Sequence, residues 1–255
     1  MQPSFPSFTA PSLALLATEP LRAALEFCSA HLGQPDTVTG DGHPVIVYPG
    51  LGAGSLATSS LRLHLKGCGF DVHDWELGVN TGPEGVFDDW IAPLAARVST
   101  LRARSGRTVS LVGWSLGGIY AREIAKLCPA SVRQVVTLAT PHHALDTNHA
   151  GTLYRLLGGD TSQLTPAMKA RLRQRPPVPL TSIYSPTDGV VSWRGCLEQP
   201  ARDTENIAVH ASHIGMPTHP DVLRIVADRL AQPEGRWRPW RPHRARAAAR
   251  RTRTA

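Results

Sequence analysis

The feature of this sequence that most constrains its fold is a series of short, continuously apolar runs that alternate with segments of helical spacing. The clearest are "PVIVYPG" at 44–50, "TVSLVGWS" at 108–115 and "VRQVVTLATP" at 132–141. Strands that are apolar throughout are typical of a sheet buried on both faces. Their alternation with helices predicts an α/β fold with a mostly parallel central sheet and helices on both faces.

The pattern along the 255 residues predicts one main domain with extensions at both ends. Residues 1–40 form a lead-in and one helix over 19–31, and 41–235 form the main domain. Within it, 142–179 mixes helical and proline-rich sequence and is predicted to be a small cap insertion. Residues 236–255 are predicted to be a basic, disordered tail. Further strands are expected at 69–75, 179–186 and 205–210, with helices at 56–67, 86–104, 117–128 and 220–232.

The first predicted helix has apolar residues on one side. Four residues recur there at helical spacing: Leu21, Ala24, Leu25 and Cys28.

The net charge of +7 belongs to the C-terminal tail. Residues 236–255 contain eight arginines and no acidic residue, so the remaining chain has a formal charge of −1. A nearly neutral domain argues against a specific nucleic-acid partner. Arginines interleaved with Trp237 and Trp240 suit an anionic membrane surface or a nucleic-acid backbone. Composition of this kind, however, more often gives a solvated extension. Peripheral membrane contact through the tail is therefore kept as the alternative.

Cysteine usage and the first residues indicate a cytoplasmic protein. Cys28, Cys68, Cys128 and Cys196 are widely spaced and form no C-x-x-C pair, which favours free thiols in a reducing compartment. The early apolar run "LALLA" is too short for the core of a signal peptide or for a membrane span.

A serine lies between glycines at the point where a predicted strand meets a predicted helix. Gly113-Trp114-Ser115-Leu116-Gly117 matches G-x-S-x-G, a motif that holds a nucleophilic serine in a strained turn. The glycines let the strand and the helix pass closely, and the helix N-terminus adds free N–H groups. The alternative is a glycine-rich turn that only connects two elements.

A serine nucleophile needs a base, and the base needs an orienting acid. Asp188 in "IYSPTDGVV" and His213 in "VHASHIGM" each follow a predicted strand. Carboxyl ends of parallel strands share one edge of the sheet, so both side chains are expected near Ser115. His210 is the competing histidine, and an aspartate before glycine is often only a turn residue.

An oxyanion needs two N–H donors. Leu116, which follows the serine, is predicted to supply one, and Leu51 in "YPGLGAG" the other, with Gly52 as the alternative. No Lys-Ser/Thr pair follows these glycines, so they do not form a phosphate-binding loop. His142, His143 and His149 have poor spacing for zinc, and we predict no metal and no cofactor.

Together, "YPGLGAG", "GWSLGG", "SPTDGVV" and "SHIGM" resemble the α/β-hydrolase superfamily, in particular bacterial lipases and esterases. The run "TLATPHHA" resembles the T-P-H segment of many of those lipases. The resemblance spans about residues 43 to 231 and implies a Ser115–His213–Asp188 triad. Pro49 stands where those lipases usually have histidine, and Ala144 where glycine often follows T-P-H-x.

The expected function is hydrolysis of a small-molecule or lipid carboxylic ester through an acyl-enzyme. Apolar residues of the insertion are expected to line an acyl pocket: Leu153, Tyr154, Leu156, Leu157, Leu164 and Met168. Two alternatives remain open at this point. One is acyl transfer to an alcohol by the same triad, and the other is a non-catalytic binding protein of the same fold with a basic tail.

Overall fold

A computed structural model describes residues 9–31, 38–145, 162 and 164–241. Its described strands form a single parallel sheet in the order β2-β1-β3-β4-β5-β6. They are β1 (Pro44–Tyr48), β2 (Asp71–Asp74), β3 (Val109–Trp114), β4 (Val132–Leu138), β5 (Leu180–Tyr184) and β6 (Thr204–Ala208). This arrangement confirms the predicted α/β class and the mostly parallel sheet.

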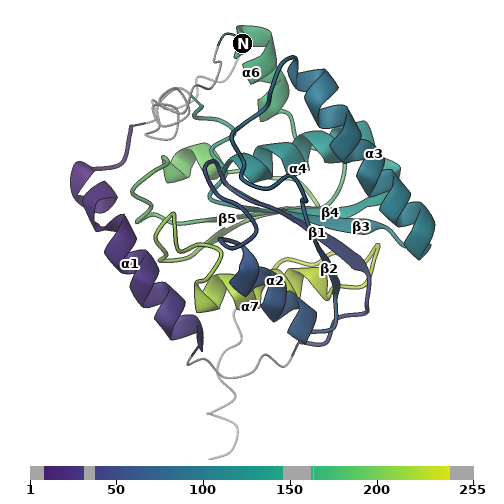
Figure 1. The fold of residues 1–255 in the computed structure, drawn as a ribbon, viewed down its shortest axis with the longest axis horizontal. Coiled ribbons are helices and arrows are strands. Elements are labelled where there is room, and N and C mark those ends of the chain that lie inside the picture. Colours follow the sequence, from purple (N-terminus) through teal and green to yellow (C-terminus); the bar gives the residue numbers. More distant parts are fainter. Residues whose placement is uncertain (1–8, 32–37, 146–161, 163, 242–255) are drawn as a thin grey trace, which may run out of the picture.

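Helices cover both faces of the sheet (Figure 1). One face packs against α3 (Phe87–Ser105) and α4 (Leu116–Leu127), and the other against α2 (Ser59–Gly67) and α7 (Pro220–Leu230). Two 3₁₀ turns, Pro129–Ser131 and Trp193–Cys196, lie in the connections.

The two faces explain why the strands are apolar throughout. In β1, Val45 and Val47 belong to the core beneath α2 and α7, whereas Ile46 and Tyr48 belong to the core beneath α3 and α4. Successive side chains of a strand point to opposite faces, so a sheet between two helical layers needs an apolar residue at every position.

The strand order reverses between β1 and β3. From β1 the chain moves outward to β2 and then returns to the other side of β1 to form β3. The loops that leave the carboxyl ends of two such strands diverge and open a crevice between them, where open α/β sheets bind ligands. Residues 49–54 follow β1 and Ser115 follows β3, so both lie at this crevice.

The first helix differs from the prediction. α1 spans Leu13–His31 rather than beginning near 19, and it runs through Pro20. The four residues at helical spacing are exposed: Leu21, Ala24, Leu25 and Cys28. The helix turns Glu19, which is 1% exposed, toward the domain instead. Apolar spacing predicted the helix, but polar contacts with loops distant in sequence decide which side is buried.

The part of the insertion that the structure describes includes one helix. Its helix, α6 (Pro166–Arg173), packs along α4, where Nε of Arg171 donates to Glu123 at 2.9 Å and Lys126 donates to the Arg171 carbonyl at 2.7 Å. These contacts lie two turns or more from the start of α4. Four of the expected acyl-pocket residues lie outside the described residues, namely Leu153, Tyr154, Leu156 and Leu157.

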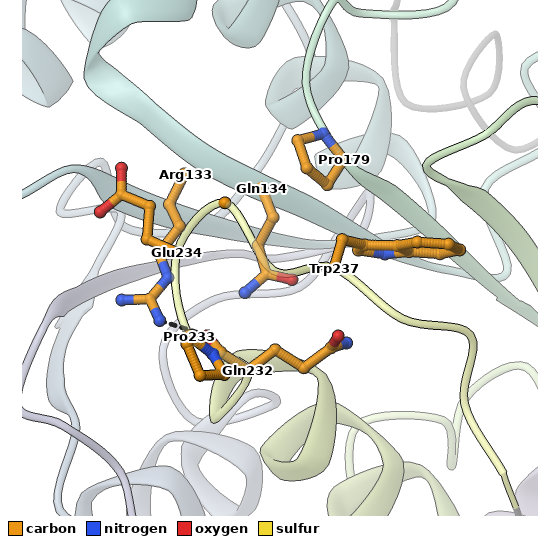
Figure 2. A pocket seen from close by; sticks show the side chains of 8 residues that line it. Arg133, Gln134, Pro179, Gln232, Pro233, Glu234 and Trp237 are labelled. Atoms are coloured by element: carbon orange, nitrogen blue, oxygen red, sulfur yellow. Dashed lines mark hydrogen bonds between the residues drawn. The ribbon is translucent and has the colours of Figure 1, made fainter.

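The start of the predicted tail follows the domain surface. The Trp240 N–H donates to Glu205 of β6 at 2.6 Å, and Arg229 of α7 donates to the Arg238 carbonyl at 2.7 Å. A shallow hollow lies beside it at the amino ends of β4 and β5, where Arg133 donates to the Gln232 carbonyl and Trp237 forms part of the wall (Figure 2). This is the sheet edge opposite Ser115. Residues 242–255 lie outside the described residues.

Candidate active site

Ser115 occupies a strained turn between β3 and α4. Its backbone has φ 53° and ψ −118°, a conformation that costs a non-glycine residue about 1–3 kcal/mol. The Ser115 N–H donates to the Leu138 carbonyl at 2.8 Å, and the Thr140 hydroxyl donates to the Ser115 carbonyl at 3.0 Å. Bonds from the end of β4 therefore hold the turn that the motif predicted.

The glycines around Ser115 lie where no side chain fits. A Cβ on Gly113 would overlap the backbone of Gly117 and Gly118, and one on Gly117 would overlap the Tyr48 carbonyl at the end of β1. The close approach of strand and helix predicted from these glycines is confirmed.

The three predicted side chains meet at the carboxyl edge of the sheet. Nε2 of His213 lies 3.1 Å from Oγ of Ser115, and Nδ1 lies 2.7 Å from Oδ2 of Asp188. Ser115, Asp188 and His213 are 6%, 3% and 5% exposed, so the chain of hydrogen bonds is shielded from water. His210, the competing histidine, is exposed.

Backbone and side-chain donors fix the orientation of the acid and of the histidine loop. Oδ1 of Asp188 accepts the N–H groups of Val190 and Val191, both at 2.8 Å, which leaves Oδ2 for His213. The Trp114 indole donates to the His213 carbonyl at 3.0 Å. An ionised carboxylate only accepts hydrogen bonds, so the proton lies on Nδ1 and Nε2 accepts from the serine.

Opposing influences act on the pKa of His213. Burial lowers it, but the Asp188 carboxylate, by its charge and its hydrogen bond, and the charge of Glu19 raise it, and the net shift is upward from 6.5. An imidazolium is therefore stabilised at this position, as a base that takes up a proton requires.

The loop after β1 lies directly against the serine. A Cβ on Gly50 would stand 3.3 Å from Cβ of Ser115. Gly52, the alternative donor, is already engaged, because its N–H donates to the Asn80 carbonyl at 2.8 Å. Among the described residues, the Leu51 N–H has no such partner, and Leu116 begins α4 with its N–H outside the helical ladder. Leu51 and Leu116 remain the predicted oxyanion donors.

Asn80, which the sequence analysis missed, secures this loop. It is fully buried, its side-chain amide donates to the Pro49 carbonyl at 2.8 Å, and its backbone pairs with both Gly52 and Ala53. Its place in "GVNTG", after a weakly apolar strand, carries no signal that would have singled it out.

His142 and His143 form a buried polar cluster after the end of β4. Their rings lie 4.3 Å apart, and Nε2 of His142 lies 3.2 Å from Glu198, which also pairs with Arg122. Burial and the Arg122 charge lower the pKa of both histidines. His149 lies outside the described residues. Within the described ranges, no three His, Cys, Asp or Glu residues come together in a way that would hold a metal ion.

None of the helices in the described ranges is both long and apolar enough to cross a membrane.

No protein-family model and no curated protein matches the sequence. Solved structures do match. Lipase B of Aspergillus fumigatus is 18% identical with a TM-score of 0.59, over 75% of this chain and 53% of that one. The mature lipase BlEst2 of Bacillus licheniformis is 19% identical with a TM-score of 0.57, over 78% and 95%. A monoacylglycerol lipase of Paleococcus ferrophilus is 15% identical with a TM-score of 0.53, over 76% and 95%.

The chain therefore spans about half the length of the Aspergillus lipase and nearly all of the other two. Sequence identities this low show a shared fold and do not identify a substrate. With its parallel sheet, its reversal of strand order and its serine at the turn after β3, this chain has the α/β-hydrolase fold.

Proposed function

We propose that this protein is a serine hydrolase that cleaves carboxylic esters. Oγ of Ser115 attacks the ester carbonyl while Nε2 of His213 takes its proton, and Asp188 stabilises the imidazolium that forms. The N–H groups of Leu51 and Leu116 hold the oxyanion. His213 then protonates the leaving alcohol, which leaves an acyl group on Ser115. A water, deprotonated by His213, attacks this acyl-enzyme, releases the acid and restores the serine.

One observation carries this proposal: the unbroken chain of hydrogen bonds from Asp188 through His213 to Ser115. A protein that only binds a partner needs neither this chain nor a serine held at positive φ, because both cost free energy without serving binding. The non-catalytic alternative is accordingly the weaker one.

The site and the names of the structural neighbours support a proposal for the substrate class. The three neighbours described above have TM-scores above 0.5 and are named as lipases, one of them a monoacylglycerol lipase. We propose a small-molecule or lipid ester as the substrate. Release of the acyl group to an alcohol instead of water would use the same intermediate, and product analysis with and without added alcohol separates the two reactions.

A fluorophosphonate probe tests the proposal directly. Such probes phosphonylate only an activated serine, so we expect one label per wild-type chain, located on Ser115 by peptide mass spectrometry. Ser115→Ala is expected to take up no label, and His210→Ala to react as the wild type does. A wild-type chain that stays unlabelled, or one that is labelled on another serine, contradicts the proposed function.

The direction of the His213 pKa shift predicts the acid limb of the pH profile. The base must be neutral to accept a proton, so kcat/KM should fall as the pH drops through the pKa of His213. Because that pKa is raised, the midpoint should lie above 6.5. The measurement is kcat/KM for a p-nitrophenyl ester from pH 5 to 9, with circular dichroism at each pH to show that the protein stays folded. A midpoint below 6.5 would contradict the upward shift of the His213 pKa.

A further inference from the structure

Helix α1 holds both loops that carry the proposed acid and base. Its Glu19 carboxylate accepts the Gly189 N–H through Oε1 at 2.8 Å and the Ile214 N–H through Oε2 at 3.0 Å. Gly189 directly follows Asp188, and Ile214 directly follows His213. One carboxylate therefore ties the loop after β5 to the loop after β6, although it lies 170 and 195 residues away in the chain.

Two further side chains of α1 hold the residues that precede the acid and the base. Arg22 donates to the Thr187 carbonyl at 2.8 Å and to Glu19 at 2.6 Å. Glu26 accepts the Ser212 N–H at 2.7 Å and the Ser212 hydroxyl at 2.5 Å. Asp188 and His213 are thus each held on both sides by α1, because Glu19, Arg22 and Glu26 lie three and four residues apart on one helical face.

The glycines after the acid and the base make room for this helix. A Cβ on Gly189 would stand 2.6 Å from the backbone of Leu15, and one on Gly215 would collide with the Glu26 carboxylate. The glycines of "TDGVV" and "SHIGM" therefore accommodate α1, which belongs to a part of the chain that precedes the whole sheet.

Burial of Leu21 and Leu25 does not account for how α1 is docked. Leu21 and Leu25 are 66% and 61% exposed, whereas the Glu19 residue is 1% exposed. α1 also lies to one side of the domain, outside the two helical layers (Figure 1). A buried carboxylate is costly unless hydrogen-bonded and paired with charge, and here backbone N–H groups of both catalytic loops and Arg22 meet that need.

We propose that Glu19 is a positioning residue, which sets the distance between Asp188 and His213 by joining their loops. This inference rests on the proposed function, since it assigns Glu19 a role in the same triad. The groups that face His213 are Asp188, Ser115 and Glu19, with Arg22 paired to Glu19 and Glu26 bonded to Ser212. Removing the Glu19 carboxylate takes away a negative charge near His213 and leaves the positive charge of Arg22 unneutralised. Each of these two effects lowers the pKa of His213.

The hydrogen bonds by which α1 holds the acid and base loops are called the clamp below. Glu19→Gln tests the clamp, with Leu21→Gln on the outward face of the same helix as the matched control. A glutamine accepts only one of the two N–H groups and turns an NH₂ toward the other. Misplacement of a catalytic group by about 1 Å costs on the order of 100-fold. We expect kcat for a p-nitrophenyl ester to fall about 10- to 100-fold in Glu19→Gln with KM little changed. Leu21→Gln should match the wild type.

The titration of His213 by NMR supplies a readout that does not depend on turnover. The pKa of His213 is expected to be lower in Glu19→Gln than in Leu21→Gln, and the acid limb of kcat/KM should move the same way. An equal pKa and an equal kcat in the two folded variants would overturn the clamp. Wild-type protein that does not react with the fluorophosphonate would instead refute the proposed function, so the two failures are distinguishable.

Glu26→Gln is the second test of the clamp if Glu19→Gln does not fold, because it loosens only the loop that carries His213. The clamp requires a fall in kcat of roughly tenfold in the folded variant, measured per active site. A wild-type kcat in the folded Glu26→Gln variant would overturn the clamp.

Discussion

Ser115→Ala is expected to lower the rate of ester hydrolysis by about 10⁶-fold, to the level that binding and the oxyanion donors sustain alone. The loss is this large because the serine oxygen forms the bond to the acyl group and no other described hydroxyl lies within hydrogen-bond distance of His213. The measurement is kcat for a short-chain p-nitrophenyl ester, with thermal unfolding to show that the variant folds.

Ser110→Ala is the matched control for this substitution. Ser110 is a buried serine of β3, the strand that precedes Ser115, but it lies near the amino end of that strand, where its hydroxyl contacts His43 at 2.8 Å. Its loss should reduce the free energy of unfolding by about 1 kcal/mol and leave kcat unchanged. A Ser115→Ala variant that hydrolyses the ester at the wild-type rate would remove the serine from the mechanism.

His213→Ala is expected to reduce kcat by a similar factor, on the order of 10⁶, because a serine without its base is a poor nucleophile. His210→Ala, three residues away and exposed, should keep the wild-type rate. The pair of variants therefore decides between the two histidines that the sequence left in competition. Loss of activity in His210→Ala alone would reverse the assignment.

The double variant Ser115→Ala/His213→Ala provides a further check on this pair. Groups that act as one unit are not additive, so the double variant should be about as slow as either single one. If the loss of kcat in the double variant equalled the product of the two single losses, the serine and the histidine would act independently, contrary to their 3.1 Å contact. Removal of His213 also leaves the Asp188 carboxylate without its side-chain partner, so the folded fraction must be measured.

Much of the fold and of the candidate site was predictable from local patterns. Continuous apolar runs identified the strands of a doubly covered sheet, since each position of such a strand faces a core. The glycines around Ser115 predicted a turn of close approach. Asp188 and His213 were predictable because carboxyl ends of parallel strands always share one edge, whatever the connections between them.

Other features depended on contacts that no local pattern encodes. The apolar spacing of Leu21 and Leu25 predicted a helix, but it did not predict that the opposite side, with Glu19, would be buried against N–H groups of the loops after β5 and β6. Asn80 likewise secures the oxyanion loop through a position with no distinctive neighbours in the sequence.

The sequence by itself thus determined the α/β class, the serine turn and the edge at which the three side chains gather, because these follow from periodicity and from strand ends. Only the tertiary structure decided that His213 rather than His210 meets Ser115, that the N–H of Gly52 is already engaged, and that Glu19 joins the acid and base loops. Each of these depends on a distance of a few ångströms between residues far apart in the chain, which a linear pattern does not contain.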